Sequence, residues 1–488
     1  MRNKVEIERR MQTGGITGAS FATVDSKGKI TPTPVGTIPD QDSQLEVTED
    51  TPFQCASLSK PVFAYLVLKL IEANKTKSAE EGWVGKFKTD FNLKTPLYTV
   101  FRDKGVVLEG DNNPFLKLFS DQEQAKQLTA EMVLSHTTGL PIVGKPPYQF
   151  QFEPGKHYAY SGPGIECLQV AIEEVTGIHN LETLAQEHVF GPLKMSKSTY
   201  GPERVAANSL KTTAKEYAQF ITAWINDDKL NYAFTPVTPA DSMKNDYLPN
   251  PKSVGRLVED IDIKDEDRDL VAWGLGIGLV KNKQGQIIGA YHTGDMGDNT
   301  AEWRSGVGAV IDPQSKRCLE ASVYLTKSPN GHILAEPFLP GVLKPGLDYF
   351  FPTYGFARDV EELDGTNFHG MNPGVLKSEL KEMAYKTKAA TPHFEPTLQS
   401  EDNSSKLPEL EEDLTESTDS TRKMFHQMSI NPLSLRPEPS TKTVKSQEEE
   451  VSSVQQVQEI EKTEEDKIQE DTIFNPTPLS ISHDPYKK

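Results

Sequence analysis

The fold is decided by residues 53–74, FQCASLSKPVFAYLVLKLIEAN. Two polar residues, Ser57 and Lys60, stand just before an apolar run from Pro61 to Asn74 that predicts a strong helix. A proline so close behind the lysine is tolerated only in the first turn of a helix, where its missing N–H would be unpaired anyway. The helix is therefore expected to begin at or just before Ser57.

Ser57 and Lys60 fit the pattern S-x-x-K, whose spacing places a hydroxyl and an amine on one face of a helical turn. Lys60 is then positioned to activate Ser57, and the Ser57 N–H at a helix start is available to a developing oxyanion. The same pattern recurs at Ser26/Lys29, Ser378/Lys381 and Ser420/Lys423. Alone the pattern is weak, and the alternative is that Ser57 simply caps the helix.

Secondary-structure signals around this helix run from β to mostly α and back to β. A strand is expected over Gly15–Val24, ending in a glycine turn. Helical patterns follow at Ala130–Ser135, Gly164–Val175, Leu181–His188 and Ala214–Asn226. Strands are then expected at Trp273–Lys281, Gln286–Tyr291, Gly306–Ile311 and Glu320–Thr326. The pattern predicts an α+β fold: an antiparallel sheet built from both ends of the domain and flanked by helices, with an inserted all-α lobe.

The C-terminal part of the chain differs in composition from the rest. From Thr391 to Lys488 there are 21 acidic and 10 basic side chains, so this tail holds −11 of the net charge of −19. Such a segment buries too little apolar surface to offset the entropy of ordering. We expect a folded domain over residues 1–345, a poorly defined extension over 346–390, and an acidic, largely disordered tail over 391–488 that is open to a protein partner.

Composition also narrows the partners and the location. No Lys/Arg-rich tract is present, so no nucleic-acid partner is expected. The most apolar stretch, Val62–Leu70, is too short to cross a bilayer, and Met1–Thr13 lacks the apolar core of a signal peptide. The chain is therefore expected to be soluble and cytoplasmic at synthesis. Cys55, Cys167 and Cys318 have neither disulfide nor metal-ligand spacing, so no metal and no cofactor are expected.

Two further segments carry residues capable of chemistry. The turn-rich loop Glu153–Gly164 presents Tyr160. One interpretation has this tyrosine packing with its hydroxyl in water, and the other has its pKa lowered by Lys60 so that it relays the serine proton. The segment Tyr291–Asp295 is expected at the end of a strand, where the Thr-Gly after His292 lets a backbone edge approach a substrate closely.

Together these segments resemble the serine β-lactamase and penicillin-recognising family, especially its class C β-lactamase, esterase and D-aminopeptidase branch. The resemblance covers Ile16 to Leu325 and includes stretches similar to LLxHTSGLP, PGxxxxYSNxGYxLLGxIIExxTG and PLGM. The five similar segments are Phe53–Lys60, Leu128–Pro141, Phe152–Gly177, Glu187–Thr199 and Lys211–Asn226. Five ordered segments are far more specific than any one motif. Within the second segment, His136 is expected to be a structural, hydrogen-bonding residue at a helix-to-loop corner.

The resemblance implies a β-lactamase/transpeptidase-like fold and a serine hydrolase domain over residues 1–345. It implies that Ser57 attacks a carbonyl to give an acyl-enzyme, while Lys60 and Tyr160 share the general acid/base work without a metal. The implied substrate is a small acyl compound or a peptide, reacting as an ester, an amide or a β-lactam.

The triplet His292-Thr293-Gly294 resembles the K-T-G element of the family, which implies that the Asp295 N–H is a second oxyanion donor. Histidine in place of lysine is common in esterase-like members and disfavours a β-lactamase, since a neutral imidazole offers no fixed positive charge to a substrate carboxylate. The Asp295 carboxylate would oppose the oxyanion unless it points away. Gly162 stands where the family often has asparagine, so either another group supplies that contact or turnover is slow.

The leading hypothesis is therefore an acyl-serine hydrolase. The alternative is a non-catalytic binding or scaffold protein on a decayed hydrolase fold, favoured by Gly162, Asp295 and the long tail. A further hypothesis concerns delivery, because the tail with Glu448–Glu450 looks like the C-terminal signals of bacterial effectors that are secreted without a cleaved signal peptide.

Overall fold

The computed structural model describes residues 4–40, 43–77, 84–238, 247–248, 256–257, 269–297 and 302–354. The expected tail over 391–488 lies outside these residues, as does the expected extension beyond residue 354. Among the helices within these ranges, none combines the length and the apolar character needed to cross a membrane.

The fold is built on an eight-stranded antiparallel sheet with the strand order β10-β11-β12-β13-β14-β1-β2-β3. The N-terminal strand β1 pairs with the late strand β14, with Phe21 opposite Tyr324. The expectation of a sheet assembled from both ends of the domain is thereby confirmed. The strands are β1 (Gly18–Val24), β2 (Ile30–Asp40), β3 (Ser43–Glu46), β10 (Val271–Trp273), β11 (Gly278–Lys281), β12 (Ile287–Gly297), β13 (Glu302–Ile311) and β14 (Cys318–Thr326).

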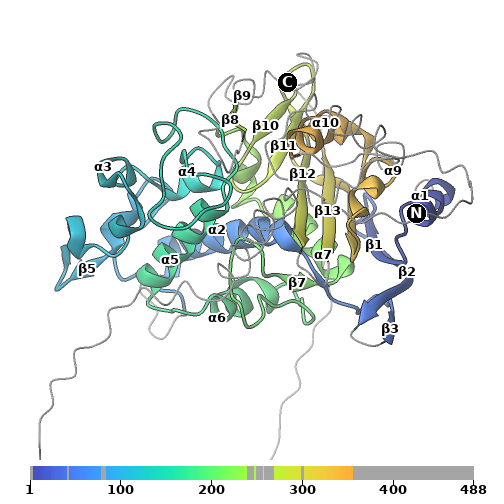
Figure 1. Cartoon of the computed structure of the whole chain (residues 1–488), viewed down its shortest axis with the longest axis horizontal. Helices are drawn as coiled ribbons and strands as arrows, with labels where there is room; N and C mark the ends of the chain where they lie inside the picture. The colour runs from blue at the N-terminus through green and yellow to red at the C-terminus, as the bar shows by residue number, and fades with distance from the viewer. Residues whose placement is uncertain are drawn as a thin grey trace, which may run out of the picture. The chain divides into compact units, whose positions relative to one another are not determined.

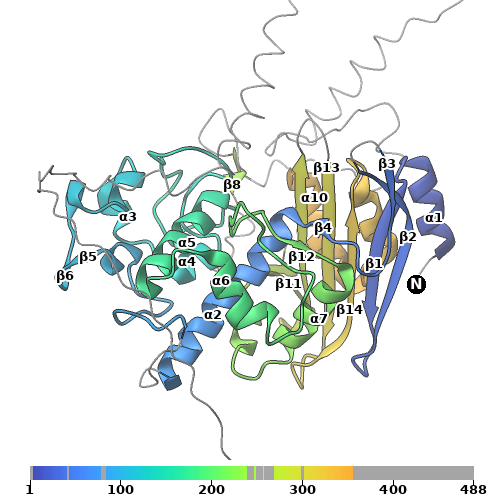
Figure 2. The ribbon, with the colours of Figure 1, turned by 90° about the horizontal axis from the view of Figure 1, so that it is seen from below.

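The two faces of the sheet are covered by different helices, because successive side chains of a strand point to opposite faces. On β1, Phe21 packs at 4.8 Å ring-centroid distance on Phe338 of α9, while the next residue, Ala22, belongs to the core that includes α7. Helix α7 covers one face, and α1, α9 and α10 cover the other (Figures 1 and 2). These helices are α1 (Lys4–Thr13), α7 (Ala214–Ile225), α9 (Ala335–Phe338) and α10 (Lys344–Tyr354).

Between β3 and β10 the chain builds a helical lobe, which lies beside the sheet (Figure 1). The predicted helices are present. Four of the five begin where a side chain accepts a hydrogen bond from a first-turn N–H, at Thr129, Ser161, Asn180 and Thr213, whereas α2 continues directly from a 3₁₀ turn. The lobe is not purely helical, since the short ladders β4–β7 and β5–β6 lie within it. Its helices before α7 are α2 (Ser59–Lys77), α3 (Gln122–Ala125), α4 (Ala130–Leu134), α5 (Gly162–Thr176) and α6 (Leu181–Ala185), which continues as a π-helical turn to Phe190. The paired short strands are β4 (Phe53–Gln54), β7 (Lys211–Thr212), β5 (Arg102–Asp103) and β6 (Val106–Val107).

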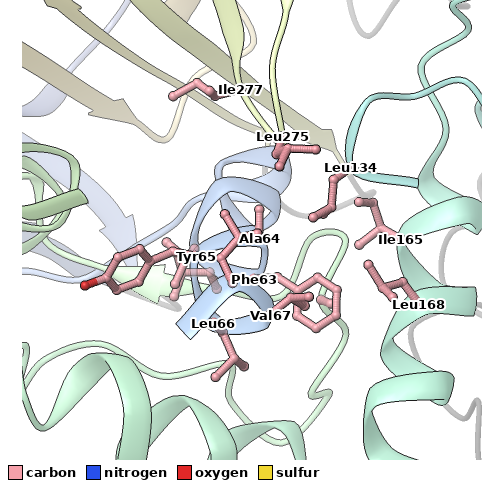
Figure 3. Packing of buried hydrophobic residues seen from close by; sticks show 14 of the residues in the cluster. Phe63, Ala64, Tyr65, Leu66, Val67, Leu134, Ile165, Leu168, Leu275 and Ile277 are labelled. Atoms are coloured by element: carbon pink, nitrogen blue, oxygen red, sulfur yellow. The ribbon is translucent and has the colours of Figure 1, made fainter. Parts of the chain in front are cut away.

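Helix α2 joins the lobe to the sheet. From Pro61 to Leu68 it is apolar on all sides, which is the composition of a helix with no solvent-facing side. Figure 3 shows its residues Phe63–Val67 among side chains from both parts of the fold. The labelled partners are Leu134, Ile165 and Leu168 from the lobe, and Leu275 and Ile277 from the turn before β11. The S-x-x-K segment is therefore anchored to the centre of the core.

The structure corrects the strand predictions at two places near the expected site. Trp273–Lys281 is not one strand but the hairpin of β10 and β11, because the chain turns at Gly276, which has a φ of +86° and contacts Ala64 of α2 so closely that a Cβ would collide. An apolar run of this length fits one buried strand or two equally well. Strand β12 does not end near Tyr291 but continues to Gly297, because β13 pairs with it over that length.

Helix α10 crosses the expected boundary between residues 345 and 346. Its residues Leu347, Tyr349 and Phe350 are buried, and the Phe350 ring lies 6.2 Å from the ring of Tyr160. The helix therefore packs with the folded domain and reaches the neighbourhood of the expected site.

Candidate active site

Ser57 lies in a 3₁₀ turn, Ala56–Leu58, that leads directly into α2. The residues around it are buried, whereas Ser57 is partly exposed. The preceding residue, Ala56, has a φ of +48°, which is uncommon for a residue with a side chain. Two buried tyrosines fix the backbone after the serine: Tyr217 Oη donates to the Leu58 carbonyl at 2.9 Å, and Tyr200 Oη donates to the Ser59 carbonyl at 3.0 Å.

Lys60 is next to the serine, as its spacing predicted. Its Nζ donates to Ser57 Oγ at 2.9 Å and to the Ala207 carbonyl at 2.8 Å, and the residue is 3% exposed. Burial lowers the pKa of Lys60 to about 7, and the charge of Glu166 opposes this shift. The amine therefore has a large neutral fraction near neutral pH and is able to accept a proton from the serine.

Tyr160 completes the cluster but with the opposite electrostatics from those expected. It is buried, and Lys60 Nζ lies 5.0 Å from the centroid of its ring. Burial raises the pKa of Tyr160, and contact with Ser57 offsets the rise only in part. The predicted lowering by Lys60 was wrong, because the cost of burying a phenolate exceeds the stabilisation that its neighbours give it.

Strand β12 packs against the serine turn through Gly294. A Cβ at this position would collide with the Cys55 carbonyl oxygen and with Ser305 Oγ. Ser305, opposite Gly294 on β13, donates to the same Cys55 carbonyl at 2.9 Å. The glycine therefore lets the strand backbone lie directly against the turn that carries Ser57. The sequence had suggested instead that the glycine lets the strand approach a substrate.

One edge of β12 is open beside the site. Strand β11 pairs with β12 only as far as Tyr291, whereas β13 pairs with it to Gly297. From His292 to Gly297 the strand consequently has a ladder partner on one side alone within the described residues. An unpaired strand edge is able to hydrogen bond an extended acyl group.

His292 is buried and neutral. Its Nδ1 lies 2.7 Å from the Thr293 carbonyl, which accepts only, so Nδ1 carries the proton. Burial, together with the charge of Lys60, lowers the pKa of His292 to about 3, and the contact with Thr293 opposes the shift. The Nε2 atom is a buried acceptor without a hydrogen-bond partner among the described residues. The position thus offers an acceptor, not a cation.

The Asp295 carboxylate is paired with a buried arginine. It forms an ion pair with Arg304, which is 1% exposed and also contacts Glu302 at 3.2 Å. Burial raises the pKa of Asp295, while Arg304 opposes this. The opposition of this carboxylate to an oxyanion is therefore reduced by a fixed positive charge.

Gly162 is the first residue of α5, and its N–H donates to the Ile142 carbonyl at 3.1 Å. Two groups that the sequence did not single out act on Lys60 instead of a side-chain amide here. The Ala207 carbonyl accepts its hydrogen bond, and Glu166, one helical turn after Gly162, interacts with its charge. Burial raises the pKa of Glu166 to about 7, with Lys60 opposing the rise. Glu166 follows Gly162 by four residues, and this helical spacing was the sequence signal that could have pointed to it.

A two-part α+β fold with a hydroxyl and a buried amine one turn apart at the junction defines the class of S-x-x-K serine hydrolases and penicillin-recognising proteins. The Beta-lactamase family model matches residues 6–316. This chain belongs to the Beta-lactamase family.

Several solved structures are similar to this chain. A class C beta-lactamase is 15% identical, with a TM-score of 0.45, over 66% of this chain and 89% of that chain. A D-alanine carboxypeptidase from Burkholderia cenocepacia is 16% identical, with a TM-score of 0.45, over 71% of this chain and 96% of that chain. An octameric penicillin-binding protein homologue from Pyrococcus abyssi is 16% identical, with a TM-score of 0.42, over 66% and 72%. No curated protein matches the chain significantly.

Proposed function

We propose that this protein is a serine hydrolase that forms an acyl-enzyme at Ser57 on a neutral ester. The observation that carries the proposal is the 2.9 Å contact between Ser57 Oγ and the Nζ of Lys60, a buried lysine whose pKa is lowered to about 7. A neutral amine in hydrogen-bond reach of a hydroxyl is the requirement for general-base activation of a serine.

The proposed reaction begins when Ser57 Oγ bonds to the ester carbonyl carbon and its proton passes to Lys60 Nζ. The carbonyl oxygen becomes an oxyanion, which we assign to the N–H groups of Ser57 and Asp295. The carbon–oxygen bond to the leaving alcohol then breaks, and the alcohol takes the proton from Lys60. In the second half of the reaction, water passes a proton to Lys60 Nζ and its oxygen bonds to the acyl carbon. The bond from that carbon to Ser57 Oγ then breaks, Oγ takes the proton back from Lys60, and the acid leaves.

Tyr160 is assigned the role of a neutral phenol in this scheme. Its raised pKa keeps the proton on the oxygen, so the hydroxyl acts as a donor toward Ser57 and the leaving oxygen and does not act as a phenolate base. Lys60 is then the general base, and Tyr160 is a hydrogen-bond donor that orients the oxygen atoms between which the proton moves.

The preference for a neutral substrate follows from the charges around the site. His292 stands where the family has a lysine, and it is neutral with a buried acceptor nitrogen. The nearby Asp295 is already paired with Arg304, so this arginine is not available as a partner for a substrate carboxylate. A compound that carries a carboxylate at this position would lose hydration without gaining an ion pair.

The test is intact-mass analysis of the full chain after incubation with a fluorophosphonate and, separately, with a penicillin. We expect one fluorophosphonate adduct in the wild type, none in Ser57→Ala, and little or no penicillin adduct. Ser26→Ala is the matched control, because Ser26 belongs to another S-x-x-K pattern but lies exposed in a turn, and it should label like the wild type. A folded wild-type protein that gives no fluorophosphonate adduct would favour the non-catalytic scaffold, and strong penicillin labelling would overturn the neutral-ester assignment.

A further inference from the structure

A histidine outside the proposed catalytic set lies against Tyr160. His136 follows α4 at the corner between helix and loop and is 1% exposed. The centroid of its ring is 4.3 Å from that of Tyr160, and the two rings are inclined by 38°. Trp273 packs on both rings, at 5.2 Å from His136 and 6.1 Å from Tyr160.

Two hydrogen bonds to His136 bracket Tyr160 along the chain. The Ala159 N–H donates to the His136 carbonyl at 2.8 Å, and the Ser161 N–H donates to His136 Nδ1 at 3.1 Å. One residue thus fixes the backbone immediately before and immediately after Tyr160. With the backbone fixed, the direction of the tyrosine hydroxyl depends only on two side-chain torsions, and the packed rings restrict both.

The second of these bonds requires a neutral imidazole. Nδ1 accepts from a backbone N–H, so it carries no proton, and the proton of the neutral ring is on Nε2. Burial lowers the pKa of His136 well below its ordinary value, and the positive charge of protonated Lys60 adds to this. The ring therefore keeps its acceptor throughout the neutral pH range.

The backbone of His136 is also unusual. Its φ is +55°, in the left-handed region that asparagine, aspartate and histidine tolerate better than other residues with side chains. This conformation turns the chain out of α4 so that both the carbonyl and the ring of His136 face the segment 159–161.

We propose that His136 is a positioning residue for the reaction: by holding the backbone on both sides of Tyr160, it directs the tyrosine hydroxyl at Ser57. The proposal deepens the sequence-based assignment of His136 to a structural corner, and its effect on turnover rests on the proposed role of Tyr160.

Two substitutions at His136 separate the loss of the Nδ1 acceptor from the loss of the ring. His136→Asn keeps an acceptor near the position of Nδ1 and tolerates the left-handed backbone, whereas His136→Gly tolerates the backbone but has no acceptor. Both remove the ring and its packing. A difference between them therefore reports the hydrogen bond to Ser161.

The first measurement is the second-order rate constant for fluorophosphonate labelling of Ser57 in full-length protein. We expect His136→Gly to label on the order of 30-fold more slowly than His136→Asn, since a misplaced catalytic group costs up to about 100-fold. In a Tyr160→Phe background the same pair should differ by less than about threefold, because there is no hydroxyl left to direct. Equal rates for the two variants, or an undiminished difference in the Tyr160→Phe background, would overturn the proposal.

A second measurement does not depend on activity. In protein labelled with ¹³C at the tyrosine rings, the Tyr160 signal is identified by its loss in Tyr160→Phe. We expect one sharp Tyr160 signal in the wild type and in His136→Asn, and a shifted, broadened or doubled signal in His136→Gly with other tyrosine signals retained. If the wild type does not react with fluorophosphonate, the proposed function fails, and this spectrum alone decides the positioning role. An unchanged Tyr160 signal in His136→Gly would refute it.

Discussion

The two sides of Ser57 are built in opposite ways. On the sheet side, Gly294 of β12 lets one backbone lie directly on another, and an added Cβ would collide with the Cys55 carbonyl. On the lobe side, Tyr160 is held by what its neighbours contribute: the ring and carbonyl of His136 and the ring of Trp273. The comparison teaches that substitutions which add atoms should do most damage on the sheet side of the site, whereas substitutions which remove atoms should do most damage on the lobe side.

The strongest way to break the sheet side is Gly294→Ala. The new methyl group meets backbone, which has no low-cost way to move, so we expect a loss of about 3 kcal/mol or more in the free energy of unfolding. Fluorophosphonate labelling should fall on the order of 100-fold in the protein that remains folded. Chemical denaturation and labelling rates measure the two effects. Gly341→Ala is the control, because a Cβ there meets no atom within 4 Å, and it should leave both quantities unchanged.

The lobe side acts on charge as well as position, and pH tests this. Lys60 is the base only when neutral, so the labelling rate should rise with pH and level off above its pKa of about 7. The Glu166 carboxylate raises the pKa of Lys60, so Glu166→Gln should move the midpoint to lower pH, by about one unit or less. The control is Glu174→Gln, on the same helix but paired with Lys88, which should leave the midpoint in place. A midpoint that stays fixed in Glu166→Gln would contradict the electrostatic role.

The smallest expected effect is that of Ser305→Ala, which tests how much the sheet side depends on a hydrogen bond. Ser305→Ala removes the donor to the Cys55 carbonyl and adds no atom, so it should cost only about 1 kcal/mol of unfolding free energy and reduce labelling a few-fold. Ser315→Ala, which loses a bond to Asp312 in an exposed turn, should cost less than about 0.5 kcal/mol. If Ser305→Ala were as damaging as Gly294→Ala, the sheet side would depend on hydrogen bonding and not on close packing.

Local spacing made part of the site predictable. Ser57 and Lys60 meet because a helical turn brings residues three apart together, whatever the rest of the chain does. One sheet shared by both ends of the domain also followed from the order of the strand signals, whereas the pairing of β1 with β14 is known only from the structure.

The rest of the site depends on tertiary burial, which no local pattern records. The direction of the Tyr160 pKa shift, the neutral state of His292 and the lowered pKa of Lys60 all follow from desolvation in the assembled core. The Ala207 carbonyl that accepts from Lys60 has no sequence signature, because every residue carries a carbonyl. His136 was recognised as a hydrogen-bonding corner, but its partners on either side of Tyr160 are set by the return of the chain 25 residues later.

The pairing of β1 with β14 has a consequence for synthesis on the ribosome. Residues 19 and 326 face each other in the sheet, so β1 waits without this neighbour until more than 300 further residues have been translated. At roughly 5–20 residues per second, that interval lasts on the order of 15 to 60 seconds. During it, Phe21 lacks both β14 and its later aromatic partner Phe338. We infer that the nascent chain exposes this face of β1 until α9, which follows β14 in the chain, has also left the exit tunnel and Phe338 reaches Phe21.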